Sequence, residues 1–326
     1  MQDNYQRHIN YLRISVTDRC NLRCVYCMPE EGVALISHTE VLSWEEMLKV
    51  VQACVQIGIR KVRITGGEPL VRLGLTYFVS KLNEIPEIDD IAITTNGILL
   101  PKYAQELKHA GLKRVNISLD TLREERFFQI TRGGSLAQVW AGAEAAINAG
   151  LEPLKFNCVA MRRKNDDEFL DFARLTLQRP FHIRFIELMP IGSSENWADN
   201  SRVTIPEIKA KLAELGPLLP GEQVTGGGPA KYYTLAGAQG TIGFISAMSE
   251  HFCEHCNRLR LTAEGKIRPC LHSKSEIDIR TLLRAGASVE DLAAIVSQAV
   301  NLKPKQHSMT DNGWADNKRV MSQIGG

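Results

Sequence analysis

The sequence predicts an α/β fold in which a parallel sheet curves into a partial (β/α)6 TIM-type barrel, closed by a C-terminal region. Three observations lead to this prediction. From residue 11 to about residue 187, short β-branched and apolar runs alternate with longer helical patterns, as in repeated βα units. Conspicuous polar residues follow the expected strands, where the functional loops of such barrels lie. With 326 residues and 44% hydrophobic content, the chain can bury a large core.

The individual elements follow from these runs. Strands are expected at residues 12–17, 62–65, 91–95, 115–119, 154–160 and 183–188. A helix over residues 43–57 begins at Ser43, which stands three residues before Glu46 and predicts a capping box. Residues 101–110 predict a helix that ends before Gly111, and residues 282–302 also have a helical pattern.

A domain boundary is expected near residue 226. The βα pattern weakens after Glu187, and the run Gly-Gly-Gly-Pro at residues 226–229 predicts a turn. We therefore expect a barrel domain over residues 1–225 and a second domain with the tail over residues 226–326.

Charge and hydropathy exclude some functions. The net charge is only +2, so the sequence predicts no broad basic field for nucleic acid. The first ten residues are polar, and no apolar run approaches the length that crosses a membrane. We expect a cytoplasmic protein that binds neither nucleic acid nor membranes.

Cys20, Cys24 and Cys27 lie in the loop after the first expected strand. This spacing suits metal binding better than disulfide bonding, which mostly serves small secreted domains. A closed zinc site has four ligands, whereas three thiolates leave one iron of a cubane cluster open to another molecule. Tyr26 directly precedes the third cysteine and is placed to pack against that molecule. The alternative is a zinc site completed by a distant histidine such as His38.

Cys253, Cys256 and Cys270 form a second triplet, which again leaves a metal position open. Arg258 and Arg260 alternate beside it, so on an extended segment they point the same way and can bind phosphate. The alternative is a zinc ribbon completed by His251, His255 or His272. The two remaining cysteines, Cys54 and Cys158, lie in apolar surroundings and are interpreted as packed thiols.

The first triplet and its aromatic neighbour resemble the radical S-adenosylmethionine superfamily, as does the run Gly66-Gly67-Glu68-Pro69 after the second expected strand. The resemblance implies a [4Fe-4S] cluster on Cys20, Cys24 and Cys27 that cleaves S-adenosylmethionine. From Tyr11 to Gly326, with its second triplet, paired arginines and Gly325-Gly326 end, the chain more closely resembles the GTP 3′,8-cyclase family of molybdenum cofactor biosynthesis.

This closer resemblance implies a complete site. A second [4Fe-4S] cluster would be held by Cys253, Cys256 and Cys270. S-adenosylmethionine would lie near Tyr26, Gly67, Glu68, Ser118 and Met189. GTP would be bound by Arg13, Arg63, Thr94, Lys155, Arg258, Leu259 and Arg260. Catalytic roles would fall to Arg258, Arg260, Gly325 and Gly326, the two glycines entering the chamber from the tail.

The resemblance also implies partners and a product. The product would be (8S)-3′,8-cyclo-7,8-dihydroguanosine 5′-triphosphate, made in the first step of the pathway. An electron donor such as flavodoxin or ferredoxin would feed the first cluster, and a pyranopterin-forming enzyme would take the product. The oligomeric state stays open, a homodimer being one arrangement.

Two other functions remain open at this point. One is a radical S-adenosylmethionine peptide maturase with an auxiliary cluster, although such enzymes usually carry more than three cysteines in the second domain. The other is a zinc protein that binds nucleotides or nucleic acid through its arginines.

Overall fold

A computed structural model describes residues 1–191, 201–307, 309 and 319–325 of the chain. Within these residues, six strands of the first half alternate with helices and pair in parallel in chain order. The six strands are β1 (Tyr11–Ser15), β2 (Lys61–Thr65), β3 (Asp90–Thr95), β4 (Arg114–Ser118), β5 (Lys155–Ala160) and β6 (His182–Glu187). Each overlaps one of the expected strands, so this part of the prediction is confirmed.

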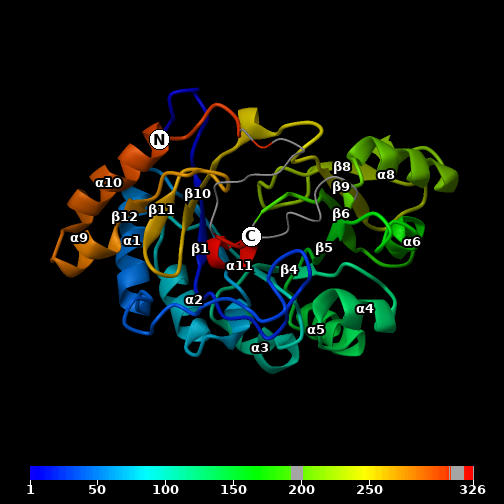
Figure 1. The fold of residues 1–326 in the computed structure, drawn as a ribbon, viewed down its shortest axis with the longest axis horizontal. Helices are drawn as coiled ribbons and strands as arrows, with labels where there is room; N and C mark the ends of the chain where they lie inside the picture. Colours follow the sequence, from blue (N-terminus) through cyan, green and yellow to red (C-terminus); the bar gives the residue numbers. More distant parts are fainter. Residues whose placement is uncertain (192–200, 308, 310–318, 326) are drawn as a thin grey trace.

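Helices cover the outside of this sheet (Figure 1). The helices between the strands are α1 (Trp44–Gln56), α2 (Leu75–Asn83), α3 (Leu100–His109), α4 (Glu124–Thr131), α5 (Leu136–Asn148) and α6 (Phe169–Gln178). The capping box is confirmed, because Ser43 Oγ accepts from the Glu46 amide at 3.1 Å and the Glu46 carboxylate accepts from the Ser43 amide at 2.7 Å. The expected helix before Gly111 is also confirmed.

The C-terminal half extends both edges of the same sheet. Its strands are β7 (Leu219–Pro220), β8 (Lys231–Thr234), β9 (Thr241–Ile245), β10 (Arg258–Leu261), β11 (Lys266–Arg268) and β12 (Ile277–Asp278). Strand β9 pairs in parallel with β6, and β10 pairs in parallel with β1. The described strands form one open sheet in the order β12-β11-β10-β1-β2-β3-β4-β5-β6-β9-β8-β7. The expected partial barrel is confirmed.

The carboxylate of Glu187, at the end of β6, fixes the chain that leaves β9. This side chain is fully buried, and it accepts hydrogen bonds from the amides of Ile205, Met248 and Ser249 at 3.0, 2.7 and 2.9 Å. Met248 and Ser249, which precede the second cysteine triplet, are thereby held at the carboxyl end of β6. Ile205 begins helix α8 (Ile205–Leu212).

The expectation of one helical stretch over residues 282–302 is wrong, because these residues do not form a continuous helix. The structure has α9 (Arg280–Arg284) and α10 (Val289–Asn301), separated by a turn. Gly286 has φ +90°, in the left-handed region that ends helices, and Ser288 starts α10 with a capping box to Asp291. Helix α10 packs against α1, and the short helix α11 (Met321–Ile324) lies near the middle of the view beside β1 (Figure 1).

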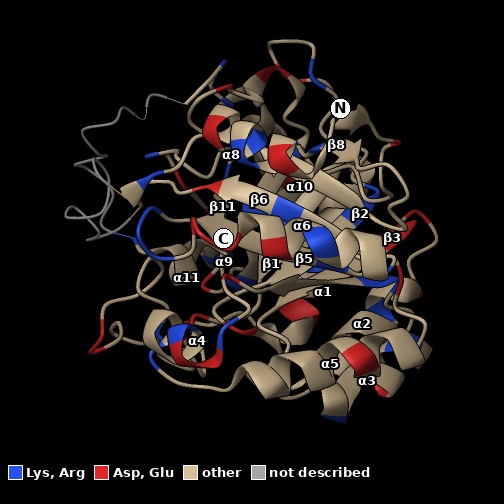
Figure 2. Ribbon diagram, turned by 90° about the vertical axis from the view of Figure 1, so that its right-hand side faces the viewer, with Lys and Arg blue, Asp and Glu red and all other residues tan. Residues whose placement is uncertain are grey.

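Acidic and basic residues are mixed along the outer helices, as on α4 and α8 (Figure 2). Among the described residues, no helix combines the length and apolar character needed to cross a membrane.

His182, at the start of β6, predicts acid sensitivity of the fold. Burial, then the charges of Lys155 and Arg184, lower the pKa of His182 to about 4. An unfolded histidine has a pKa of about 6.5, so the unfolded chain binds more protons and the free energy of unfolding decreases as pH falls from about 6.5 to about 4. His182 Nδ1 lies 2.8 Å from Thr241 Oγ1. The variant His182→Asn keeps a hydrogen-bond partner for this hydroxyl but has no side chain that titrates in this range.

Urea unfolding near pH 7.5 and near pH 5 measures this effect. We expect the original chain to lose about 1–2 kcal/mol more than His182→Asn between the two conditions. Equal losses in both proteins would contradict the assignment.

Candidate active site

All six clustered cysteines line one cavity at the carboxyl ends of the parallel strands. The expectation that the first triplet follows a strand does not by itself bring the two triplets together, because they are separated by more than two hundred residues. The sheet brings them together, since β10 of the C-terminal half pairs directly with β1. The cysteines that line the cavity are Cys20, Cys24, Cys27, Cys253, Cys256 and Cys270.

The first triplet is held in a tight loop after β1. The amides of Cys27 and Met28 both donate to the Cys24 carbonyl, at 2.9 and 3.1 Å, and the Leu22 amide donates to Cys20 Sγ at 3.4 Å. Burial raises the pKa of Cys20 to about 11 and that of Cys27 to about 12. Cys24 also feels the charges of Cys27 and Cys20, and Cys27 feels the charge of Cys20. The three sulfur atoms therefore form one electrostatic group.

The Gly66-Gly67-Glu68-Pro69 loop packs directly on the segment before this triplet. The Gly67 amide donates to the Thr17 carbonyl and the Glu68 amide to the Arg19 carbonyl, both at 2.8 Å. A Cβ on Gly67 would lie 2.3 Å from the Arg19 carbonyl oxygen, so this close approach requires glycine. The contact accounts for Gly67 without any ligand.

Glu68 is buried in a set of donors at the ends of β2 and β3. Its carboxylate accepts from the amides of Leu70 and Asn96 at 3.0 and 2.7 Å and from Thr95 Oγ1 at 2.7 Å. Burial outweighs these hydrogen bonds and raises the pKa of Glu68 to about 7. The group is thus fixed in position and faces the cavity.

Tyr26 is positioned by Asp120, a residue that sequence reasoning missed. The Tyr26 hydroxyl donates to Asp120 Oδ2 at 2.8 Å, and the Val159 amide donates to Asp120 Oδ1 at 2.8 Å. Asn165 Nδ2 donates to the Asp120 carbonyl at 2.7 Å and to the Val159 carbonyl at 2.8 Å. These bonds tie the first cysteine loop to β5.

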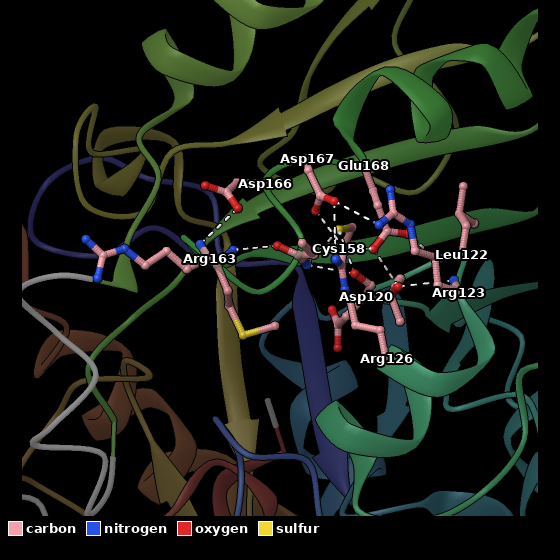
Figure 3. Close-up of polar contacts among 12 residues, drawn as sticks. Asp120, Leu122, Arg123, Arg126, Cys158, Arg163, Asp166, Asp167 and Glu168 are labelled. Carbon is pink, nitrogen blue, oxygen red and sulfur yellow. Dashed lines mark hydrogen bonds and ion pairs between the residues drawn. The ribbon is translucent and has the colours of Figure 1, made fainter.

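A second buried carboxylate supports this connection (Figure 3). Glu168 is fully buried; it accepts from Thr121 Oγ1 and from the Leu122 amide, both at 2.6 Å, and from Arg126. The residues directly after Asp120 are therefore anchored to the start of α6.

Three arginines stand side by side across neighbouring strands and line the cavity. The strand register places Arg13 opposite Arg260 on one side and opposite Arg63 on the other. Burial, then the charge of Arg260, lowers the pKa of Arg13 well below its usual range. Burial, then Arg258, lowers the pKa of Arg260 to about 9. A polyanion bound against these three arginines would relieve the repulsion between their positive charges.

Two further basic residues, Lys155 and Arg184, lie on β5 and β6. Burial, then Arg184, lowers the pKa of Lys155 to about 6, and its Nζ atom donates to the carbonyls of Val224 and Thr225. Arg184 Nη2 donates to Asn116 Oδ1 at 2.6 Å and lines the cavity. Sequence reasoning missed Arg184, although its alternation with the apolar residues of β6 is visible in the run His-Ile-Arg-Phe.

The second triplet has the opposite electrostatic surroundings from the first. Burial alone would raise the pKa of Cys256, but Arg258 and Lys303 lower it to about 6. Arg258 Nη2 and Lys303 Nζ lie 3.8 and 3.7 Å from Cys256 Sγ. Among the expected alternative zinc ligands, His272 lines the cavity, whereas His251 and His255 are exposed.

The donor sets fit iron–sulfur clusters. The cysteines have formed no disulfides, and the members of each triplet interact with one another electrostatically. Within the described part of the chain, no group of three or more His, Cys, Asp or Glu side chains is arranged around the position of a single metal ion. A cubane cluster needs no such arrangement, because each thiolate binds a different iron atom.

The C-terminal tail reaches the arginine row. The Gly325 carbonyl accepts from Arg260 Nη1 at 2.6 Å and from Arg13 Nη2 at 3.3 Å. Gly325 has φ +67°, and a Cβ there would lie 2.5 Å from Thr65 Oγ1. Gly326 lies outside the described residues.

Most of the expected site residues therefore meet at one cavity. Besides the six cysteines, the lining includes Arg13, Tyr26, Arg63, Gly67, Glu68, Thr94, Ser118, Met189, Arg258 and Arg260. Lys155 and Gly325 are not part of the lining: Lys155 donates to the carbonyls of Val224 and Thr225, and Gly325 accepts from the lining residues Arg13 and Arg260. Leu259 lies between the two arginines of β10 with its side chain in the hydrophobic core.

Comparisons with known proteins agree with these features. The family model described as the Radical SAM superfamily matches residues 14–176, and the one described as Molybdenum Cofactor Synthesis C matches residues 181–309. A protein of Heliobacterium modesticaldum named GTP 3′,8-cyclase is 60% identical over 329 residues, covering 100% of both chains. A protein of Pelotomaculum thermopropionicum with the same name is 58% identical over 327 residues, again covering 100% of both.

Solved structures show the same fold at low identity. Streptococcus suis SuiB bound to S-adenosylmethionine matches with a TM-score of 0.61 and 13% identity, covering 89% of this chain and 68% of that one.

The contact between Tyr26 and Asp120 predicts a measurable loss of stability. Asp120→Ala removes the acceptor for the Tyr26 hydroxyl and the Val159 amide, so we expect the free energy of unfolding to fall by about 1–3 kcal/mol. Asp120→Asn keeps an acceptor and should lose less. Asp166→Ala is the matched control, because its carboxylate accepts from the Arg163 amide in an exposed contact (Figure 3).

Urea unfolding followed by circular dichroism under anaerobic conditions gives the three values. If Asp120→Ala were no less stable than Asp166→Ala, the hydrogen bonds of Asp120 would not stabilise the contact between the first cysteine loop and β5.

Proposed function

The chain belongs to the GTP 3′,8-cyclase family of the radical S-adenosylmethionine superfamily, and we propose that it catalyses the first step of molybdenum cofactor biosynthesis. In this reaction GTP is converted to (8S)-3′,8-cyclo-7,8-dihydroguanosine 5′-triphosphate. The observation that carries the proposal is the arginine row, which lines the same cavity as both cysteine triplets.

We propose that Cys20, Cys24 and Cys27 hold one [4Fe-4S] cluster and that Cys253, Cys256 and Cys270 hold a second. When bound, the first cluster supplies the electron that splits S-adenosylmethionine into methionine and a 5′-deoxyadenosyl radical. Beside it, Tyr26, Gly67, Glu68, Ser118 and Met189 line the cavity and would bind the S-adenosylmethionine. The fixed carboxylate of Glu68 suits a cationic amine, because it is held by three donors and faces the cavity.

GTP would lie against the opposite wall. Its triphosphate would supply the negative charge that the neutral oxygens at these cations, such as the Gly325 carbonyl at Arg260, do not provide. The GTP-binding residues of this proposal are Arg13, Arg63, Thr94, Lys155, Arg258, Leu259 and Arg260. Leu259 would contribute by holding the two arginines of β10 on the cavity side, since its own side chain packs in the core. Arg258 and Arg260 would stabilise negative charge during the reaction.

The same proposal includes partners. A flavodoxin or ferredoxin would deliver the electron, and a pyranopterin-forming enzyme would consume the product in the cytoplasm.

The activity is tested anaerobically with reconstituted protein, dithionite, S-adenosylmethionine and GTP. We expect 5′-deoxyadenosine and a cyclised guanosine triphosphate to form together, and both to depend on Cys20, Cys24 and Cys27. The double variant Arg258→Ala, Arg260→Ala should keep its iron but lose GTP turnover at least about tenfold, because its cationic wall is reduced. Formation of 5′-deoxyadenosine with GTP untouched would show that the substrate is wrong.

The tail is tested by Gly325→Ala. The added methyl group would collide with Thr65 Oγ1, and the positive φ would be strained, so the tail should leave the arginine row. We expect cyclised product to fall at least about tenfold while the iron content stays unchanged. Gly237→Ala is the control, because its φ is +76° but nothing lies within 4 Å of the added atom.

Product yield per iron, measured by chromatography, separates the two variants. Deletion of Gly325 and Gly326 should repeat the loss seen with Gly325→Ala. Normal cyclisation in the deleted protein would remove the tail from the mechanism.

A further inference from the structure

Lys303 is a buried cation directly beside the second cysteine triplet. It follows helix α10, and only 3% of the residue is exposed. Its ammonium lies 3.7 Å from Cys256 Sγ, 2.7 Å from the Arg258 carbonyl oxygen and 2.8 Å from the Pro269 carbonyl oxygen. Pro269 directly precedes Cys270, so one side chain contacts both segments that carry the triplet.

The three contacts indicate the charged form of Lys303. A neutral amine has two hydrogen atoms to donate, whereas an ammonium has three. Three acceptors surround the nitrogen, and one of them is the sulfur of Cys256. A thiolate at this position would supply the counter-charge that makes a buried ammonium stable.

Lys303 does not serve the substrate side of the site. Arg258, the other cation beside Cys256 Sγ, lines the cavity, but Lys303 is not part of that lining. Its ammonium approaches the sulfur from the protein side. A direct role in binding GTP is therefore left to the arginines.

The position of Lys303 is fixed by Arg7 from the N-terminal segment. The Arg7 guanidinium donates to the carbonyls of Cys253, Pro304 and Lys305 at 2.8, 2.8 and 3.1 Å. Its Nε atom pairs with Asp3 at 2.6 Å. The segment after α10 is thus bound to the first cysteine of the triplet as well as to the second.

We propose that Lys303 is a positioning residue for the second cluster, and that its positive charge raises the reduction potential of that cluster. Hydrogen bonds to the sulfur ligands and nearby charge are the means by which proteins set such potentials. Reduction adds negative charge to the cluster, and a buried ammonium beside a ligand sulfur stabilises the reduced form. The inference rests on the proposed second cluster.

The test isolates the second cluster by replacing Cys20, Cys24 and Cys27 with serine in the full chain. After anaerobic reconstitution, iron content and circular dichroism report loading and folding, and a potentiometric titration followed by electron paramagnetic resonance gives the midpoint potential. The variants Lys303→Met and Lys303→Gln remove the charge, and Gln keeps a donor if Met does not fold. Lys303→Arg keeps the charge. Lys266→Met is the matched control, because it removes one positive charge from a more exposed ion pair with Asp278.

We expect the equilibrium constant for one-electron reduction to fall at least about tenfold in Lys303→Met and Lys303→Gln, equal to about 59 mV. Lys303→Arg and Lys266→Met should stay close to the parent. A loaded Lys303→Gln protein with an unchanged potential would overturn the role of Lys303 while leaving the cluster in place. A parent protein that assembles no cluster on the second triplet would overturn the cluster proposal, and this inference with it.

Discussion

Burial of like charges in register is the constraint on which this site depends. Arg260, Arg13 and Arg63 occupy equivalent positions on β10, β1 and β2, with Lys155 and Arg184 on β5 and β6. The partners of Arg63 and Arg260 are neutral oxygens, from the Tyr11 hydroxyl and the carbonyls of the tail. Such partners satisfy hydrogen bonds but cancel no charge, so the wall stays strongly positive. A rigid sheet whose outer face is buried is needed to keep these cations close together against their mutual repulsion.

The parallel arrangement of the strands explains why much of the fold and site could be predicted from the sequence. Parallel strands place their loops at one end, so residues after successive apolar runs had to meet there. That reasoning placed the first triplet and the Gly66-Gly67-Glu68-Pro69 loop together, and the alternation of Arg258 and Arg260 gave their common direction on β10. The resemblance to a known family added ligand roles that spacing alone did not contain.

The rest could not be predicted because it depends on contacts between residues far apart in the chain. Lys303 and Arg7 look like ordinary surface cations in the sequence, yet both are buried against the second triplet. Asp120 reaches Tyr26 only because β4 and the first cysteine loop converge. The split between α9 and α10 was missed because apolar periodicity continued across Gly286, whose positive φ ends the helix locally.

The two triplets therefore share a ligand type but differ in electrostatic environment. Carboxylates face the first: Glu68 raises the pKa of Cys20, and Asp120 raises that of Cys24, each adding to burial. Cations face the second, where Arg258 and Lys303 lower the pKa of Cys256. Negative surroundings oppose the addition of an electron and positive surroundings favour it, so two clusters of one type would not have the same potential. The asymmetry comes from the topology, because β10 enters the sheet carrying its own arginines and α10 delivers Lys303 behind it. A chain that built both sites from one repeated motif would lack this difference.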